Sequence, residues 1–170
     1  MAVRSQDQAD FEAYVAARAA ALRRTAYLLC GDWHQAEDVV QNALTKLYLA
    51  WRRVEKRDGI DAYARQIVVR CVLDERRRGW RRERPVSALP DRAGVAERSD
   101  DREVLLAALA SVPAQQRAVL VLRYWDDVSI AETAAMLGIS EGAVKSAASR
   151  GLDNLRRALP DLTLTASEED

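Results

Sequence analysis

The sequence predicts an all-α protein in which two small helical domains are joined by a flexible linker. Ala, Leu, Arg and Glu dominate the 170 residues, whereas Gly (7) and Pro (4) are scarce, which favours helix throughout. Apolar residues recur at helical spacing on both sides of residues 84–102, where Pro, Gly and Ser stand among charges with little periodicity. The predicted organisation is a first domain over 8–83, a linker over 84–102, a second domain over 103–159 and an acidic tail over 160–170.

The first domain is predicted to contain three helices. Helical periodicity begins at Phe11 and spans residues 11–29, where Gly31 ends it. A second helix is expected over about 33–54, with a wide apolar stripe that consists of Val39, Val40, Ala43, Leu44, Leu47 and Trp51. Gly59 marks a turn, and a third helix follows over about 61–78. Three helices of this length can bury a shared core.

The second domain contains the most informative motif. Helical periodicity restarts at Glu103, and Pro113 suits the first turn of a further helix that ends near Tyr124. Residues 129–157 then form two apolar-patterned segments around Gly138, which is the pattern of a helix-turn-helix. Gly138 tolerates the positive φ that such a turn needs, and the following Ser140 can cap the second helix.

A helix-turn-helix places its second helix in the DNA major groove, so DNA is the first candidate partner. The alternative is a helix pair that only packs a core. The distribution of charge favours the first interpretation. Although the formal net charge is zero, basic residues crowd the end of the first domain: Arg52, Arg53, Lys56, Arg57, Arg65, Arg70, Arg76, Arg77, Arg78, Arg81, Arg82 and Arg84.

Tyr63 and Trp80 lie among these cations. Arginine forks suit phosphates, and aromatic faces beside a cationic groove hold unpaired bases by stacking. The alternative is a solvated basic face whose aliphatic stems cover the core. The second helix differs, because residues 36–44 combine acids and amides with an apolar stripe and suit a protein partner with basic side chains.

Catalysis finds little support in the sequence. His34 is the single histidine, and Cys30 and Cys71 match no metal spacing. No glycine-rich phosphate loop is present, so neither an enzyme nor a cofactor is expected. The N-terminus lacks the apolar region of a signal peptide, and no apolar run is long enough to span a bilayer, so we expect a cytoplasmic protein without membrane insertion.

The order of these parts resembles the extracytoplasmic-function group of bacterial RNA polymerase sigma factors, in particular a sigma-E-like subgroup of actinobacteria. The resemblance covers residues 8–158. LLCGDWHQAEDVVQNALTKLYLAW resembles the core-binding helix of conserved region two, and DAYARQIVVRCVLDERRRGWRRE resembles the promoter-melting helix that follows it. LASVPAQQRAVLVLRYWDDVSIAETAAMLGISEGAVKSAASRGLDNLRRAL resembles region four. The resemblance implies a dissociable subunit that gives core polymerase its promoter choice at transcription initiation.

The resemblance also implies roles for individual residues. Docking on the polymerase clamp helices falls to Asp38, Gln41 and Asn42, with Leu44 and Leu47 behind them. The loop over 54–61 matches the segment that captures a flipped minus-ten base. Contacts to the opened minus-ten strand fall to Tyr63, Arg65, Gln66, Arg70, Asp74 and Arg77. Recognition of the minus-thirty-five element falls to Ala143, Lys145, Ser146, Ser149 and Arg150.

Three positions depart from the family pattern. Arg70 stands where a small amide is common, and Ala147 and Ala148 stand where many relatives have larger side chains. Fewer side chains that reach base edges would shift recognition toward phosphate contacts or duplex shape.

The partners implied are core RNA polymerase and promoter DNA, with the linker threaded through the polymerase cleft. Many members of the family are also held by an anti-sigma factor, which the residues of this chain neither require nor exclude. The alternative functions are a stand-alone helix-turn-helix regulator that needs no core polymerase, and a partner-binding adaptor with a sigma-like fold.

Overall fold

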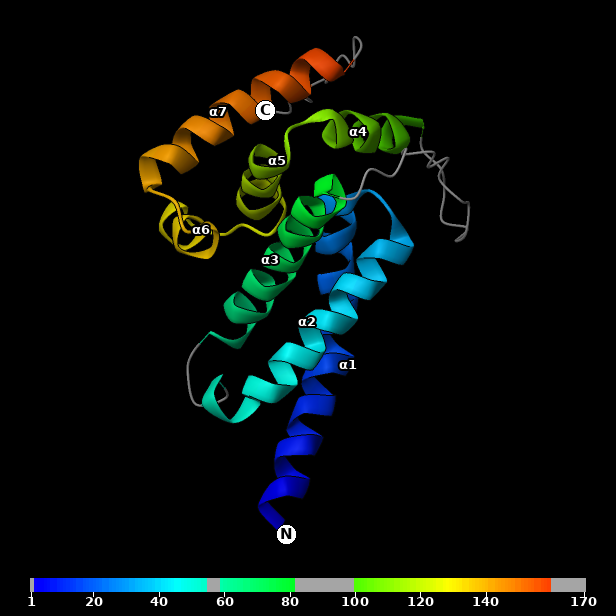
Figure 1. Cartoon of the computed structure of the whole chain (residues 1–170), viewed down its shortest axis with the longest axis vertical. Helices are drawn as coiled ribbons and strands as arrows, with labels where there is room; N and C mark the ends of the chain where they lie inside the picture. The colour runs from blue at the N-terminus through cyan, green and yellow to red at the C-terminus, as the bar shows by residue number, and fades with distance from the viewer. Residues whose placement is uncertain (1, 55–58, 82–99, 160–170) are drawn as a thin grey trace, which may run out of the picture.

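The computed structural model describes residues 2–54, 59–81 and 100–159, and these ranges are helical except for short connections (Figure 1). The predicted all-α fold is therefore confirmed. The elements are α1 (Ala2–Cys30), α2 (Trp33–Val54), α3 (Ile60–Arg81), α4 (Asp100–Ser111), α5 (Ala114–Leu120), the π-helical segment η1 (Val121–Trp125), α6 (Ile130–Leu137) and α7 (Glu141–Ala158).

Helices α1, α2 and α3 pack against one another as a three-helix unit, which is called the first unit below (Figure 1). Gly31 has φ 79° between α1 and α2, and the Asp32 carboxylate accepts a hydrogen bond from the Gln35 N–H at 2.7 Å, which caps the start of α2. The predicted bounds of α2 are correct. Helix α1 begins well before Phe11, where the apolar periodicity starts.

The apolar stripe of α2 forms the centre of the first unit. Leu47 and Val39 are fully buried there, and Val68 of α3 lies in the same cluster. Aromatic rings pack together at the end nearer the N-terminus. The Phe11 ring meets the Trp51 ring edge to face with centroids 5.1 Å apart, and it meets the Tyr48 ring with centroids 5.0 Å apart. The first unit is thus held by long helices with large apolar side chains.

Elements α4 to α7 form the second unit, which contains the helix-turn-helix. The helix predicted from Pro113 to Tyr124 is present as α5 followed by η1, so the backbone widens to π-helical geometry in its second half. Helix α7 crosses α5 closely at Gly151, where an added Cβ would lie 3.1 Å from Leu120. Helix α4 begins at Asp100, earlier than Glu103, within the stretch predicted as linker.

The turn of the helix-turn-helix has the predicted chemistry. Gly138 ends α6 in the left-handed region with φ 66°, and the Ser140 hydroxyl accepts a hydrogen bond from the Ala143 N–H at 3.1 Å. A capping box that the sequence analysis did not identify begins α6: Ser129 and Glu132 exchange hydrogen bonds between side chain and backbone.

The two units touch. Figure 1 shows α5 and α6 beside α3 and α4 across one end of the first unit, with α7 on the outer side of α5. Helix α1 contacts α4, α5 and η1. Buried residues of the second unit, including Val112, Leu122 and Val128, belong to the same apolar cluster as the core of α1, α2 and α3. The sequence did not predict this shared core.

Candidate nucleic-acid and polymerase interface

The predicted docking residues form an exposed row on α2. Asp38, Gln41 and Asn42 are exposed and lie on one face because residues three and four positions apart are neighbours on a helix. Leu44 is half-buried, and Leu47 is fully buried, so Leu47 supports this face from behind rather than reaching its surface.

The same row continues into an apolar residue that the sequence analysis did not select. Leu49 is 78% exposed and follows Asn42 by seven residues, two helical turns further along α2. The neighbouring Tyr48 is 51% exposed. The sequence contained a signal for this residue, because Leu49 is a large apolar residue at a position outside the buried stripe of α2.

Five of the six residues predicted to meet the minus-ten strand form one stripe along α3. Successive members are three or four residues apart, which places them on a single face; they are Tyr63, Gln66, Arg70, Asp74 and Arg77. Arg70, Asp74 and Arg77 are exposed, and the other two are half-buried. The side chain of Trp80, the second aromatic expected there, lies outside the described residues.

Arg65 does not join this stripe. A step of two residues from Tyr63 turns the helix by about 200°, so Arg65 points to another face of α3. Its Nε lies 3.8 Å from Oδ2 of Asp126, which follows η1 in the second unit. The predicted role of Arg65 therefore needs a different account from that of the other five.

Asp126 lines a small pocket between the two units together with Thr25 and Arg65. Thr25 on α1 donates its hydroxyl hydrogen to Asp126 at 3.0 Å, and the Asp126 side chain is only 12% exposed. Burial raises the pKa of Asp126, while the Thr25 hydrogen bond and Arg65 oppose that shift. A similar cluster at the start of α3 joins Tyr14, Arg18 and Asp61, in which the Tyr14 hydroxyl donates to Asp61 at 3.0 Å.

The residues predicted to read the minus-thirty-five element are all exposed on α7: Ala143, Lys145, Ser146, Ser149 and Arg150. They occupy the half of α7 turned away from the buried Val144 and Gly151. Because the N-terminal part of a recognition helix meets base edges, this face has the arrangement that major-groove recognition requires.

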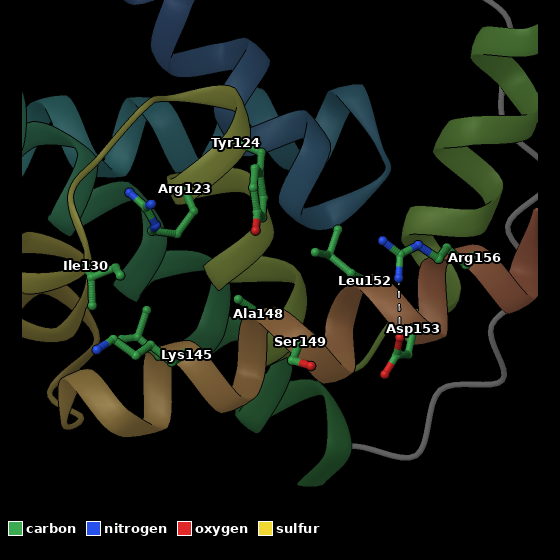
Figure 2. A pocket seen from close by; sticks show the side chains of 10 residues that line it. Arg123, Tyr124, Ile130, Lys145, Ala148, Ser149, Leu152, Asp153 and Arg156 are labelled. Carbon is green, nitrogen blue, oxygen red and sulfur yellow. Dashed lines mark ion pairs between the residues drawn. The ribbon is translucent and has the colours of Figure 1, made fainter. Parts of the chain in front are cut away.

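A groove of about 440 Å³ runs beside this face (Figure 2). Arg123 and Tyr124 of η1 line one side of it, and Lys145 and Ser149 of α7 line the other. Sequence analysis did not select Arg123 or Tyr124, although Tyr124 is 61% exposed. Their position depends on the π-helical geometry of η1, which no local sequence pattern predicted.

Ala147 and Ala148 are half-buried and pack against the small apolar cluster of Val119, Ala134 and Val144. Their small size therefore serves the packing of α7 within the second unit. The sequence analysis treated both positions only as lost base contacts.

Three predicted segments lie wholly or partly outside the described residues. They are the base-capturing loop predicted over 54–61, of which 55–58 lie outside, the linker predicted over 84–102, of which 84–99 lie outside, and the acidic tail over 160–170.

The described residues contain no cluster of His, Cys, Asp and Glu suited to a metal ion. His34 is exposed, and both cysteines are free thiols. Within the described ranges, no helix has the length and apolar character needed to cross a membrane.

The fold is that of a helical protein in which a helix-turn-helix unit packs on a three-helix unit. The family model for sigma-70 region 2 matches residues 14–82, and the family model for sigma-70 region 4 matches residues 102–155. The RNA polymerase sigma-E factor of Streptomyces coelicolor is 37% identical over 165 residues, which cover 95% of this chain and 93% of that protein. The sigma factor SigL of Mycobacterium tuberculosis is 36% identical over 159 residues, which cover 86% of this chain and 87% of that protein.

Among solved structures, the sigma factor RpoE of Bartonella quintana in complex with the anti-sigma factor NepR superposes with a TM-score of 0.71 at 26% identity. That similarity covers 88% of this chain and 96% of the other. The chain belongs to the extracytoplasmic-function group of RNA polymerase sigma factors.

Proposed function

We propose that the chain binds core RNA polymerase and directs promoter-specific transcription initiation through three separate surfaces. These surfaces are the α2 row, the α3 stripe and the exposed half of α7. The observation that supports this best is that most of the residues expected for each task share one helix face, in a chain of the sigma family. The exceptions are Leu47, which lies behind the α2 row, and Arg65, which lies on another face of α3. The polymerase performs the bond chemistry, and the sigma factor supplies no catalytic group.

The α2 row is proposed to dock on core polymerase. Asp38 offers a carboxylate, Gln41 and Asn42 offer amides, and Leu49 adds exposed apolar area. An acidic and amide surface complements a basic partner helix, and burial of an exposed apolar side chain on association is favourable. Leu49 is thus proposed as a docking residue beyond those expected from the sequence.

The α3 stripe is proposed to hold the opened minus-ten strand. Tyr63 offers a face on which an unpaired base can stack, and Arg70 and Arg77 offer guanidinium groups to phosphates. Such contacts lower the cost of melting, because flipped bases lose less stacking energy when a protein surface receives them.

The exposed half of α7 is proposed to bind the minus-thirty-five element as duplex. Lys145 lies in the first turns of α7, where the helix N-terminus also favours phosphate. Neither DNA-binding unit needs high affinity alone, because core polymerase fixes their separation and so raises the effective concentration of each for its element.

We further propose that the protein acts in the cytoplasm, where polymerase and chromosomal DNA are found. An anti-sigma factor is proposed as a further partner, supported by the similarity to the Bartonella quintana sigma factor, which was solved with one.

The decisive experiment combines purified core polymerase, this protein and a promoter library, and scores run-off transcripts. We expect transcripts that depend on the added protein and that share an upstream and a downstream element. A folded protein that yields no dependent transcript from any promoter would overturn the proposal. Nanomolar, sequence-specific duplex binding without polymerase would instead support the stand-alone regulator.

Two variants test the division of labour and serve as controls for each other. Lys145→Ala should weaken recognition of the upstream element about tenfold, in line with the loss of one DNA contact, and should leave core binding intact. Asp38→Arg should impair holoenzyme formation and leave duplex binding by the second unit intact. Core binding is measured by pull-down and promoter binding by footprinting; exchanged phenotypes would show that the surfaces are wrongly assigned.

A further inference from the structure

Asp74 is the one acid in the α3 stripe. It follows Arg70 by four residues and precedes Arg77 by three, so the three side chains are neighbours on one exposed helix face. An exposed carboxylate on a surface that meets DNA lowers affinity, because carboxylates and phosphates repel each other. The position of Asp74 therefore needs a physical explanation.

The fold does not neutralise this carboxylate. Opposite charges three or four residues apart on a helix can form ion pairs, yet within the described ranges Asp74 pairs with neither arginine. The next residue, Glu75, is different, because it is half-buried and accepts a hydrogen bond from Nε2 of Gln35 on α2 at 3.3 Å. Glu75 thus joins α3 to α2, whereas the Asp74 carboxylate is exposed to solvent.

The chemistry of a carboxylate limits what Asp74 can bind on DNA. An ionised carboxylate accepts hydrogen bonds and donates none, so phosphates and base carbonyls cannot satisfy it. Its best partners are the exocyclic amino groups of adenine, cytosine and guanine, because hydrogen bonds to a charged acceptor are strong. Thymine has no amino group, and it presents O4 and a methyl group on the edge where adenine and cytosine present theirs. Asp74 therefore suits an amino-bearing base.

The two flanking arginines compensate for the repulsion. Arg70 and Arg77 are exposed, and each guanidinium can bind a phosphate through its fork of donors. Contacts to phosphates position a strand without reading its sequence, whereas contacts to base edges specify the sequence. The order Arg70, Asp74, Arg77 thus places one group that can read a base between two groups that can hold the backbone.

We propose that Asp74 is a specificity-determining residue, which selects a base with an exocyclic amino group and rejects thymine at one position of the opened minus-ten strand. The Asp74 carboxylate accepts a hydrogen bond from the amino group while Arg70 and Arg77 hold neighbouring phosphates. A group that repels phosphate and accepts only from certain bases gives specificity at a cost in affinity. This inference rests on the proposed function of the α3 stripe.

Transcription from a promoter library by reconstituted holoenzyme tests the selection. With the native protein, thymine at one position of the downstream element should lower transcript yield about tenfold, in line with the cost of one mismatched base. Asp74→Asn keeps the size of the side chain but replaces the carboxylate with an amide, which both donates and accepts. In this variant the thymine penalty should disappear, and yields from thymine-bearing promoters should rise.

Glu75→Gln is the matched control. It makes the same change of charge one residue away and keeps an amide oxygen that can accept from Gln35. Its base profile should be that of the native protein. Asp74→Asn should keep the native melting temperature and the native affinity for core polymerase, because Asp74 is exposed and lies outside the α2 row. Base profiles that change equally in both variants would overturn the proposal, since charge alone would then explain them.

Removal of the amino group from the base tests the contact itself. At the responsive position, adenine is replaced by purine that lacks the amino group, or cytosine is replaced by uracil. Native protein should lose about tenfold more transcript than Asp74→Ala, because alanine has no acceptor and feels only the altered base pair. An equal loss for the two proteins would contradict a hydrogen bond from the base to Asp74.

Failure of this proposal and failure of the sigma function give different results. If native protein and Asp74→Asn both yield dependent transcripts with the same base profile, the role of Asp74 is overturned and the sigma function stands. If the native protein yields no dependent transcript, the sigma function is rejected, and the role of Asp74 is rejected with it.

Discussion

The two units of this chain reach a defined shape by different physical means. The first unit consists of three helices of 22 to 29 residues whose buried Val, Leu and Ile side chains form the core. The second unit uses shorter helices, including α5 with 7 residues and α6 with 8. Isolated helices of that length are marginal in water, so α5 and α6 depend on packing in the shared core and also on local devices.

Those devices lie around the helix-turn-helix. The capping box of Ser129 and Glu132 begins α6, Gly138 ends it, and Ser140 begins α7. Gly151 then lets α7 approach α5 closely. Packing therefore positions the long α2 and α3 surfaces, whereas turn chemistry and a close helix crossing position α7.

The largest expected effect concerns the core of the first unit. Leu47→Ala should destabilise the protein by about 2–5 kcal/mol, because Leu47 is fully buried and its removal leaves a cavity. The measurement is the free energy of unfolding in urea. Leu49→Ala, in the same helix but 78% exposed, should change stability by less than about 0.5 kcal/mol and should weaken core-polymerase binding. Equal losses in the free energy of unfolding for the two variants would contradict the view that core packing stabilises the first unit.

A smaller effect is expected where α7 crosses α5. Gly151→Val should cost about 1–3 kcal/mol, since a Cβ there already lies 3.1 Å from Leu120 and the added methyl groups would overpack the crossing. Gly142→Val is the control in the same helix, because the nearest atom to its Cβ is the Ser140 hydroxyl at 3.9 Å. Thermal unfolding of both variants gives the comparison. If Gly151→Val leaves thermal stability unchanged, α7 and α5 can pack with a wider separation than they have in the native protein.

The smallest expected effect concerns the capping box of α6. Hydrogen bonds from Ser129 lower the pKa of Glu132 in the folded protein. A lowered pKa stabilises the fold above the ordinary pKa of glutamate, and that contribution is lost as the pH falls through the folded value. Glu132→Gln keeps the cap hydrogen bond without the charge. The melting temperature of the native protein should therefore fall further than that of Glu132→Gln when the pH is lowered from 6 to 3.

Ser129→Ala removes the hydroxyl partner and should likewise reduce the dependence of melting temperature on pH. If native protein and both variants show parallel profiles, the capping box does not contribute to the acid sensitivity of the second unit.

Local chemistry made much of the structure predictable. The bounds of α2 follow from its apolar period and from Gly31, and the turn between α6 and α7 follows from Gly138 and Ser140. Five minus-ten candidates share one face of α3 because helical spacing alone decides which residues share a face. Arg65 was grouped with them by family resemblance, whereas its helical position separates it from them.

The sequence by itself determined the class of the protein, the helices and the residues that each exposed face presents. These follow from period, caps and turn residues, which act over a few positions along the chain. Only the tertiary structure decided that Asp126 meets Thr25 and Arg65, that Arg117 seats on α1, and that Gly151 lies against Leu120. Such contacts join residues that are distant in sequence, and their geometry depends on how whole helices pack.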